Sequence, residues 1–302
     1  MNKKYVFAKL SKFDSLGVRL GGAGLGNILF PWARAIIFAR KNNLELINTT
    51  WKTLKIGPLL RGEIDTRGYS SLFEENNIKG LKKFNLLNFK KRYSENNINE
   101  FLNEKSESVL IFTNMKNQML DILDDYDIVK NELCKITKKE HLENIKKFDG
   151  KGITVHIRMG DFTIPGSEAE IRNGKTNCRL PLKWYISIIN KIREEINNDI
   201  PVNIFSDGKD EELKEILSLS NVKRHYYGSA IADMLAISKS QLLIASNSTF
   251  SLWASYLGRM PTIWFPGTHR IKLYKNSPEI FEDSIDYNDN LNKFNLNILS
   301  NY

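Results

Sequence analysis

The sequence is poor in cysteine. Cys134 and Cys178 are the only two, and neither has a second cysteine or a histidine at the spacing of a metal site. This scarcity argues against a disulfide framework and against a zinc centre. Long apolar runs are also missing, because no stretch reaches the ~18 residues of a membrane span. The start, MNKKYVFAKLSKFD, lacks the apolar core of a signal peptide. We therefore expect a cytoplasmic protein without a bound metal.

The composition is that of a folded globular protein. The 302 residues suffice for two domains of about 150 residues each or for one large domain. The net charge of +9 favours anionic partners such as nucleotides, phosphorylated lipids or nucleic acid. Basic runs at 82–83, 90–92 and 138–139 carry part of this excess, and they are also consistent with a plain solvated surface. Charge alone therefore selects no partner.

The first half predicts a parallel strand-helix-strand unit. Residues 16–43 have the pattern of a short strand, a glycine-rich loop and a helix, which we expect to begin near Phe30 because Pro31 suits a first turn. LELINTT is expected to form the next strand. Farther on, SVLIFTN at 108–114 predicts a strand, and helical spacing predicts helices over 117–130 and 138–148.

From residue 153 onward, strand and helix patterns alternate strictly, from ITVHIRM to MPTIWFP. Such alternation predicts a parallel sheet covered by helices on both faces. The expected fold class is therefore α/β, with two Rossmann-like domains, 1–149 and 150–302, whose parallel sheets face a central cleft. The last helix is expected to pack back on the first domain.

Three of these strands carry polar residues at their carboxyl ends. They are His156 and Arg158 with Asp161, then Ser206 and Asp207, then Ser246, Asn247, Ser248 and Thr249. In parallel sheets, ligands bind at the carboxyl ends of the strands, near the point where the strand order reverses. All three groups can therefore face one ligand.

Within ITVHIRMGDF, residues 153–162, strand alternation places His156 and Arg158 on the same side. A guanidinium at this edge offers a rigid fork of donors that suits phosphate oxygens, and it stays charged at any working pH. The alternative is a structural ion pair between Arg158 and Asp161.

Two further loops bear on ligand binding. SNSTFSLWASYL, residues 246–257, ends a strand and begins a helix, so its hydroxyls and N–H groups can bind an anion or simply cap the helix. GGAGLGN, residues 21–27, fails the dinucleotide pattern because Asn27 stands where the third glycine would be, and it lacks the lysine of a P-loop. We interpret this loop as a close backbone approach to a ligand or as a tight turn.

Taken together, these segments resemble the bacterial α-1,2-fucosyltransferases of glycosyltransferase family eleven. The resemblance rests on GGAGLGN with PWARAIIFAR, VHIRMGDF, LPLKWYISII, IFSD, ADMLAISKSQLLIASNSTFSLWASYL and TIWFP, in this order. It implies a GT-B fold, GDP-fucose as the donor substrate with no other cofactor, no divalent metal, and inversion at the sugar carbon. It also implies transfer to a galactoside hydroxyl in the synthesis of a bacterial surface polysaccharide such as O-antigen or capsule.

The same resemblance implies roles for single residues. Arg158 would grip the donor diphosphate, while His156 and Asp161 would fix the surrounding turn. The donor pocket would be lined by Asp207, Ser246, Asn247, Ser248, Thr249 and Phe250, with Gly24, Gly26 and Asn27 facing it from the first domain. One position departs from the family, which often has a second arginine where this chain has Met159. By strand alternation, position 159 points away from Arg158, so this departure does not empty the phosphate site.

Several questions stay open at this point. The base that deprotonates the acceptor could be His156 or a carboxylate of the first domain such as Asp14 or Glu63. One competing function is a relative of the same fold that uses another sugar nucleotide. The other is a nucleic-acid-binding protein, but no RNA or DNA module is recognisable, so we expect no nucleic-acid partner. A lipid-linked glycan acceptor and peripheral contact with an anionic membrane surface are further expectations.

Overall fold

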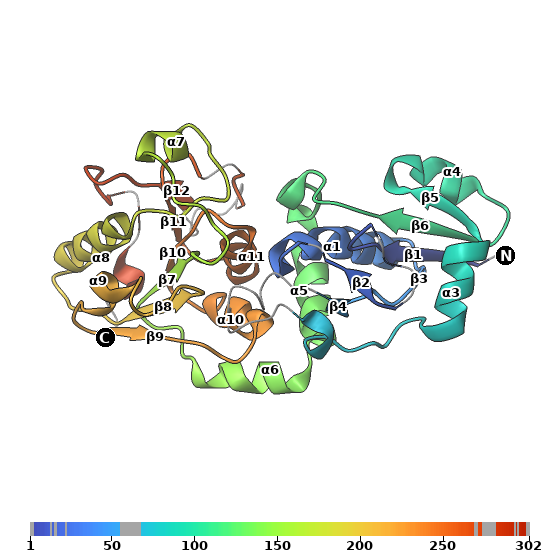
Figure 1. The fold of residues 1–302 in the computed structure, drawn as a ribbon, viewed down its shortest axis with the longest axis horizontal. Coiled ribbons are helices and arrows are strands. Elements are labelled where there is room, and N and C mark those ends of the chain that lie inside the picture. Colours follow the sequence, from blue (N-terminus) through green and yellow to red (C-terminus); the bar gives the residue numbers. More distant parts are fainter. Residues whose placement is uncertain are drawn as a thin grey trace. The chain divides into compact units, whose positions relative to one another are not determined.

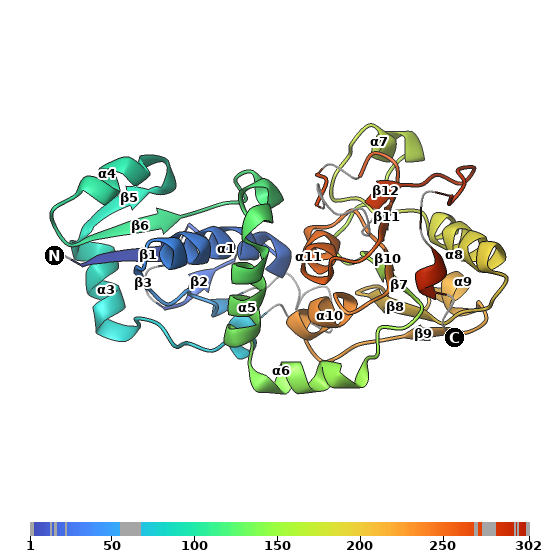
Figure 2. The same ribbon diagram turned by 180° about the vertical axis from the view of Figure 1, so that it is seen from behind.

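The computed structural model describes residues 3–12, 14, 17–21, 23–54, 68–268, 271–273, 282–292, 294 and 296–299 (Figures 1 and 2). The chain divides into two compact units, Met1–Leu142 and Glu143–Tyr302. This division falls a few residues before the boundary at 149/150 that the sequence predicts. Each unit contains its own parallel sheet, so each is described by itself.

The first unit is built on a four-stranded parallel sheet in the order β3-β1-β6-β5. The strands are β1 (Lys4–Ala8), β3 (Glu45–Leu46), β5 (Lys91–Ser94) and β6 (Ser108–Phe112). A separate parallel pair joins β2 (Arg19–Leu20) to β4 (Thr53–Leu54). The strand expected at 108–114 is confirmed as β6, which pairs along its whole length with β1.

Helix α1 (Leu25–Lys41) packs against β1 and β6 and begins five residues before the expected start at Phe30. Pro31 lies inside the helix, because burial of Leu25, Ile28 and Leu29 stabilises the turns that precede it. The other helices of this unit are α3 (Gly80–Phe89), α4 (Ile98–Asn103), α5 (Tyr126–Ile136) and α6 (Lys139–Asn144), which runs on into the second unit.

The helix expected over 117–130 is wrong in its first half. Asn117 and Gln118 have positive φ angles of 48° and 46°, a backbone conformation that interrupts a right-handed helix. The chain instead forms two 3-10 segments, η3 (Gln118–Asp121) and η4 (Leu123–Asp125), before α5 begins at Tyr126. Further 3-10 segments are η1 (Tyr69–Ser71), η2 (Glu95–Asn97) and η5 (Ile145–Lys147).

The second unit has a six-stranded parallel sheet in the order β12-β11-β10-β7-β8-β9. The strands are β7 (Ile153–Ile157), β8 (Val202–Ser206), β9 (Val222–Arg224), β10 (Leu242–Ile244), β11 (Thr262–Trp264) and β12 (Glu282–Ser284). The predicted alternation is confirmed, although β12 was not foreseen because its sequence, EDS, is polar. The helices are α7 (Glu168–Arg172), α8 (Leu182–Ile196), α9 (Lys214–Leu217), α10 (Ala230–Ile237) and α11 (Thr249–Gly258).

The sheet of this unit is covered on both faces, with α8 on one side and α10 and α11 on the other (Figures 1 and 2). Ile153, Val155 and Ile157 of β7 join the core on the α8 side. Thr154 and His156 point to the opposite face, where Thr154 bonds to Ser240 and His156 to Ser251. The strand alternation predicted for this segment is therefore confirmed.

The last described helical turn, η6 (Leu296–Leu299), packs within the second unit, and its expected contact with the first domain stays a prediction. Leu296 and Leu299 are buried in the core of the second unit, and Gln241 donates to the carbonyl of Ile298 at 3.0 Å. Apolar side chains in this turn hold it against α8.

Over the part of the chain that the structure describes, no helix is both long and apolar enough to cross a membrane.

Candidate functional site

The strand order of the second unit reverses between β7 and β10. The chain places β8 and β9 on one side of β7, and then β10, β11 and β12 on the other. Because β7 and β10 pair in parallel, the segments that leave their carboxyl ends are neighbours. These segments carry Arg158 and Ser246, and Asp207 follows β8 on the other side of β7. Crevices at such reversals are where open α/β sheets bind their ligands.

Arg158 lies between two carboxylates. Its Nη1 donates to Asp207 and its Nη2 to Asp161, and its guanidinium carbon lies 5.4 Å from the ring centroid of Phe162. The structural ion pair with Asp161 is therefore present, together with a second pair to Asp207. The side chain of Arg158 keeps 21% exposure. A partly exposed guanidinium can exchange a carboxylate for a phosphate oxygen, because both acceptors match its fork.

Asp207 also fixes the backbone that carries Arg158. Its Oδ1 accepts the N–H of Met159 at 2.7 Å. Glycine at position 160 leaves room for the side chain of Asp207, since a Cβ there would collide with Oδ2 of Asp207. The side chain of Met159 is buried in the core with that of Ile157, so the position where the family often has an arginine faces away from Arg158. A different arginine, Arg179, donates to the sulfur of Met159 at 3.6 Å.

His156 is buried, with 6% exposure, within a cluster of hydroxyls. Its Nδ1 lies 2.7 Å from Oγ of Ser251 and 3.0 Å from Oγ of Ser246, and the two hydroxyls are 2.9 Å apart. The imidazole packs on the ring of Phe250 with centroids 4.8 Å apart. The histidine therefore ties the end of β7 to the turn that begins α11.

Two of the three candidate bases can be located. Burial lowers the pKa of His156 to about 3, and the positive charge of Arg158 acts in the same direction. The imidazole is neutral near pH 7 and accepts a proton poorly, which favours an orienting role. Asp14 is buried in the first unit, accepts the N–H of Leu10 at 2.8 Å, and has its carboxyl pKa raised by burial. Glu63 lies outside the described residues.

Residues 246–251, which we call the 246–251 turn, comprise the end of the β10–α11 connection and the first residues of α11. Ser248 caps the helix, because its Oγ accepts the N–H of Ser251 at 3.2 Å, and its hydroxyl lies 2.8 Å from that of Ser246. The side-chain amide of Asn247 donates to the carbonyl of Lys175 at 3.0 Å. Thr249 and Phe250 are the first two residues of α11. Capping, the alternative to anion binding at this turn, is therefore present and leaves anion binding open.

Sequence reasoning did not single out Ser251, although it contacts His156 and the cap residue. It stands three positions after Ser248, the spacing at which the side chain of a capping residue meets the first turn of its helix. That spacing was the signal available in the sequence.

Gly24, Gly26 and Asn27 belong to the first unit. Gly24 is the residue before α1, and the N–H of Asn27 bonds to its carbonyl at 3.1 Å. Gly26 and Asn27 are therefore in the first turn of α1 and not in the loop where the sequence predicted them, because the helix begins at Leu25. Their part in donor binding stays a prediction, and Gly22 lies outside the described residues.

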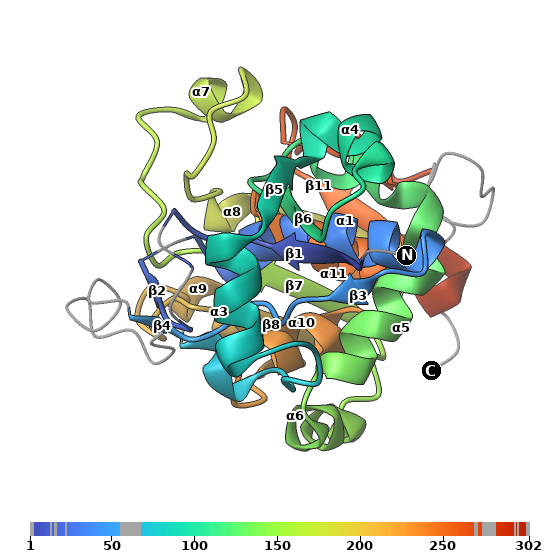
Figure 3. The ribbon, with the colours of Figure 1, turned by 90° about the vertical axis from the view of Figure 1, so that its right-hand side faces the viewer.

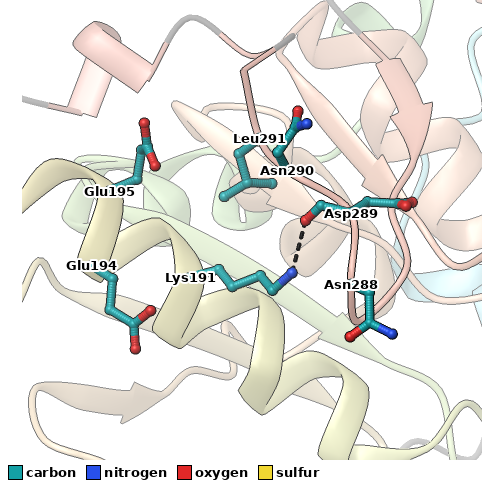
Figure 4. Close-up of a pocket in the computed structure, with 7 residues that line it drawn as sticks. All are labelled: Lys191, Glu194, Glu195, Asn288, Asp289, Asn290 and Leu291. Atoms are coloured by element: carbon teal, nitrogen blue, oxygen red, sulfur yellow. Dashed lines mark hydrogen bonds between the residues drawn. The ribbon is translucent and has the colours of Figure 1, made fainter.

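A pocket of about 410 Å³ lies between α8 and residues 288–291 (Figure 4). Lys191 crosses it and donates to the carbonyl of Asp289 at 2.7 Å. None of the site residues predicted from the sequence lines this pocket, so we assign it no part in the site. A second pocket, of about 360 Å³, includes Met159 and Ile164 in its wall and adjoins the loop that carries Arg158.

Among the described residues, no cluster of three or more His, Cys, Asp or Glu could hold a metal ion.

Comparisons with solved structures agree with the fold of the chain. The crystal structure of NodZ α-1,6-fucosyltransferase co-crystallized with GDP has a TM-score of 0.50 at 14% identity, over 88% of this chain and 96% of that one. NodZ soaked with GDP-fucose gives 0.51 at 13%, and selenomethionine NodZ from Bradyrhizobium gives 0.50 at 13%, each over 88% of this chain and 95% of the other. At these identities the likeness shows the fold, and the expected α/β fold of GT-B type is confirmed.

This fold, together with the match to a glycosyltransferase family, defines the class of protein as a GT-B glycosyltransferase. Residues 109–268, slightly more than half of the chain, match glycosyl transferase family 11, and the chain belongs to that family. The resemblance drawn from the sequence motifs is confirmed at this level. No curated protein matches the chain in sequence.

Proposed function

We propose that this chain is an α-1,2-fucosyltransferase that transfers fucose from GDP-fucose to a hydroxyl of a galactoside, with inversion and without a divalent metal. The observation that supports this most directly is that Arg158 follows β7 at the strand reversal of a family 11 chain, where His156 of the same strand contacts Ser246. NodZ, which shares the fold, has been crystallised with GDP and soaked with GDP-fucose.

The proposed reaction is a single displacement. The acceptor oxygen forms a bond to C1 of fucose on the face opposite GDP, while the bond from C1 to the β-phosphate oxygen breaks and its electron pair leaves with GDP. The acceptor proton passes to a base that this proposal leaves unassigned. Negative charge grows on the diphosphate, where Arg158 and the N-terminal amides of α11 can stabilise it.

Donor binding requires Arg158 to release one of its carboxylates. Asp161 is the one that leaves in this proposal, because its side chain is 40% exposed and Asp207 is 28% exposed. Asp207 is held in addition by the N–H of Met159. The diphosphate then takes the place of Asp161, while Asp207 keeps the guanidinium oriented.

The donor is tested by calorimetric titration of the protein with GDP, GDP-fucose, GDP-mannose and UDP-sugars, each with and without EDTA. We expect binding of GDP and GDP-fucose that EDTA leaves unchanged. Preference for a UDP-sugar would instead support the alternative of another sugar nucleotide. In a separate transfer assay, loss of turnover on addition of EDTA would contradict the metal-independent mechanism.

The role of Arg158 is tested by Arg158→Ala. Removal of one charge-stabilising donor typically costs ~3 kcal/mol, or ~100-fold in rate, so we expect transfer to fall by about that factor. The matched control is Arg40→Ala, which removes an exposed arginine paired with Glu132 in the first unit and should leave transfer unchanged. Equal activity of the two variants would contradict the proposal.

The acceptor side of the proposal is a galactose-containing, lipid-linked precursor of a surface polysaccharide, such as O-antigen or capsule. Incubation with GDP-fucose and a set of free galactosides, followed by NMR of the product, tests both linkage and stereochemistry. We expect a fucose in α linkage on the 2-hydroxyl of galactose. A product with a retained configuration or with another linkage would contradict this part of the proposal.

A further inference from the structure

Residues 79–92 of the first unit, KGLKKFNLLNFKKR, contain six basic residues and no acidic residue. They form α3 together with the start of the edge strand β5. None of these residues takes part in the donor site described above. A helix that is basic and also carries large apolar residues is typical of segments that lie on a membrane surface.

The inner face of α3 is fixed to the first unit. Leu86 and Leu87 are buried in a cluster with Tyr5 and Val109 of the sheet. Lys83 also turns inward, with 7% exposure, and its Nζ donates to the carbonyl of Asn48 at 2.7 Å and to Oγ1 of Thr50 at 2.6 Å. The helix is therefore a rigid platform, and its outer face needs no folding step before it can bind.

The outer face of α3 is apolar at three positions. Leu81 is 82% exposed, Phe89 is 73% exposed and Phe84 is 37% exposed, and the two phenylalanine rings lie 6.0 Å apart. In Figure 3, α3 lies at the surface of the first unit. We call these three residues the α3 apolar face. Large exposed apolar side chains gathered on one helix indicate an interaction surface more strongly than scattered ones do.

Five exposed cations stand close to these residues in the sequence, namely Lys79, Lys82, Lys90, Lys91 and Arg92, and we call them the basic rim. Three of them have carboxylate partners at the surface: Lys82 with Glu45, Lys90 with Glu107 and Lys91 with Glu104. Within the described ranges, neither Lys79 nor Arg92 has a carboxylate at ion-pair distance. The rim of the α3 apolar face therefore has a net positive charge.

We propose that the α3 apolar face and its basic rim dock on an anionic lipid bilayer. Leu81, Phe84 and Phe89 enter the boundary between headgroups and acyl chains, while the rim cations contact the headgroups. The charge complementarity selects anionic lipid over neutral lipid, and the apolar face selects a bilayer over nucleic acid. A nucleic acid would attract the cations but gives exposed leucine and phenylalanine on a helix nothing to insert into.

This inference deepens the proposed function, since a protein held at a bilayer by α3 would meet a lipid-linked acceptor there. The test needs neither donor nor acceptor, so its failure is distinguishable from failure of the proposed transferase activity. Calorimetric binding of GDP to each variant, measured without lipid, reports on the donor site separately.

The apolar face is tested by cosedimentation of the full chain with vesicles of phosphatidylcholine alone and of equal parts phosphatidylcholine and phosphatidylglycerol. We expect binding to the anionic vesicles and little binding to the neutral ones. The triple variant Leu81→Ser, Phe84→Ser, Phe89→Ser should lower the partition coefficient at least ~10-fold. The control Leu120→Ser, which removes a 55% exposed leucine of η3 in the same unit, should bind like the wild type.

The basic rim is tested by Lys79→Ser, Lys82→Ser and Arg92→Ser together. We expect weaker binding to anionic vesicles and a shallower loss of binding as salt rises from about 0.05 M to about 0.5 M. Lys139→Ser with Lys147→Ser removes two exposed lysines elsewhere and should change binding little.

Two results would overturn the inference. One is equal binding of the wild type and the apolar triple variant to anionic vesicles. The other is salt-sensitive binding to an RNA homopolymer that depends on the rim cations, with no binding to vesicles. Circular dichroism melting should be similar for all variants, because every substituted side chain is exposed or partly exposed.

Discussion

Asp207 and Arg158 are joined across neighbouring parallel strands, and the same carboxylate also accepts the N–H of Met159 at 2.7 Å. One acidic side chain therefore holds both the guanidinium and the backbone of the candidate phosphate-binding arginine. A guanidinium held in this way loses less side-chain entropy when a diphosphate binds. Pre-orientation of this kind contributes to the rate only if the held geometry matches the one in which charge develops.

Asp207→Asn separates orientation from charge. Asparagine keeps an oxygen for the N–H of Met159 but loses the ion pair with Arg158. We expect kcat to fall about 10-fold because the guanidinium is less well held, while the Kd for GDP changes less than about 3-fold because repulsion of the diphosphate also decreases. Steady-state kinetics and calorimetry measure the two quantities. Asp210→Asn, which removes a 72% exposed partner of Arg224, is the control. An unchanged kcat would show that Asp207 does not orient Arg158.

Asp161→Asn should strengthen the binding of GDP. If the diphosphate binds Arg158 as proposed, Asp161 competes with it. The side chain of Asp161 is 40% exposed, so screening limits the effect of its charge. We expect the Kd for GDP to fall about 3-fold, as measured by calorimetry at low salt. Glu212→Gln removes a carboxylate of similar exposure that is paired with Arg179, and GDP affinity should then stay the same. Weaker binding of GDP to the Asp161 variant would mean that this carboxylate helps to bind the donor.

The second unit was largely predictable from the sequence because its strands are buried on both faces and separated by helices of regular period. The first unit was not. The strand β1, KYVFA, lies near the basic start of the chain, where no strand was predicted. The strand β5, KRYS, is a polar edge strand. Short polar strands such as β5 and β12 are fixed by their neighbours in the sheet and give little local signal.

The candidate site was predicted in part for the same reason. Arg158, Asp207 and Ser246 follow predicted strands, so the rule for parallel sheets was enough to bring them to one edge. The contact between His156 and Ser251 depends on how α11 lies against the end of β7, which is a tertiary relationship. No spacing within one segment could have predicted it.

Acidification should destabilise the protein through His156. Burial lowers the pKa of this imidazole from 6.5 to about 3, so the unfolded chain binds more protons on it than the folded protein between these values. Its contribution to stability is therefore fully present above pH 6.5 and is lost as the pH falls toward 3, by up to ~1.4 kcal/mol per pH unit. Burial lowers the pKa of His225 as well, which adds to the same trend.

Urea unfolding of the wild type and of His156→Gln at pH 7.5, 6.5 and 5.5 checks this prediction, with these pH values chosen on either side of a reference pKa of about 6.5. The variant should be less stable at neutral pH, because a well-packed side chain is lost. Its free energy of unfolding should, however, depend less on pH, by about 1 kcal/mol between pH 6.5 and 5.5. Parallel curves for the two proteins would show that the buried imidazole is not the group that titrates.

Ser248 and Ser229 allow a comparison of two helix caps in the same unit. Ser248 caps α11 by accepting the N–H of Ser251 at 3.2 Å, and Ser229 caps α10 by accepting the N–H of Ala232 at 3.3 Å. Replacement of either serine by alanine should lower the free energy of unfolding by about 1 kcal/mol, because each leaves a helix N–H without its partner.

Only the cap of α11 adjoins the hydroxyl of Ser246 at the strand reversal. We therefore expect Ser248→Ala to weaken GDP binding about 10-fold in calorimetry, since a hydroxyl donor and the order of the first-turn amides are lost together. Ser229→Ala should leave GDP affinity unchanged. If both variants lose stability equally and neither loses affinity for GDP, the 246–251 turn serves only as a helix cap and the donor phosphates bind elsewhere.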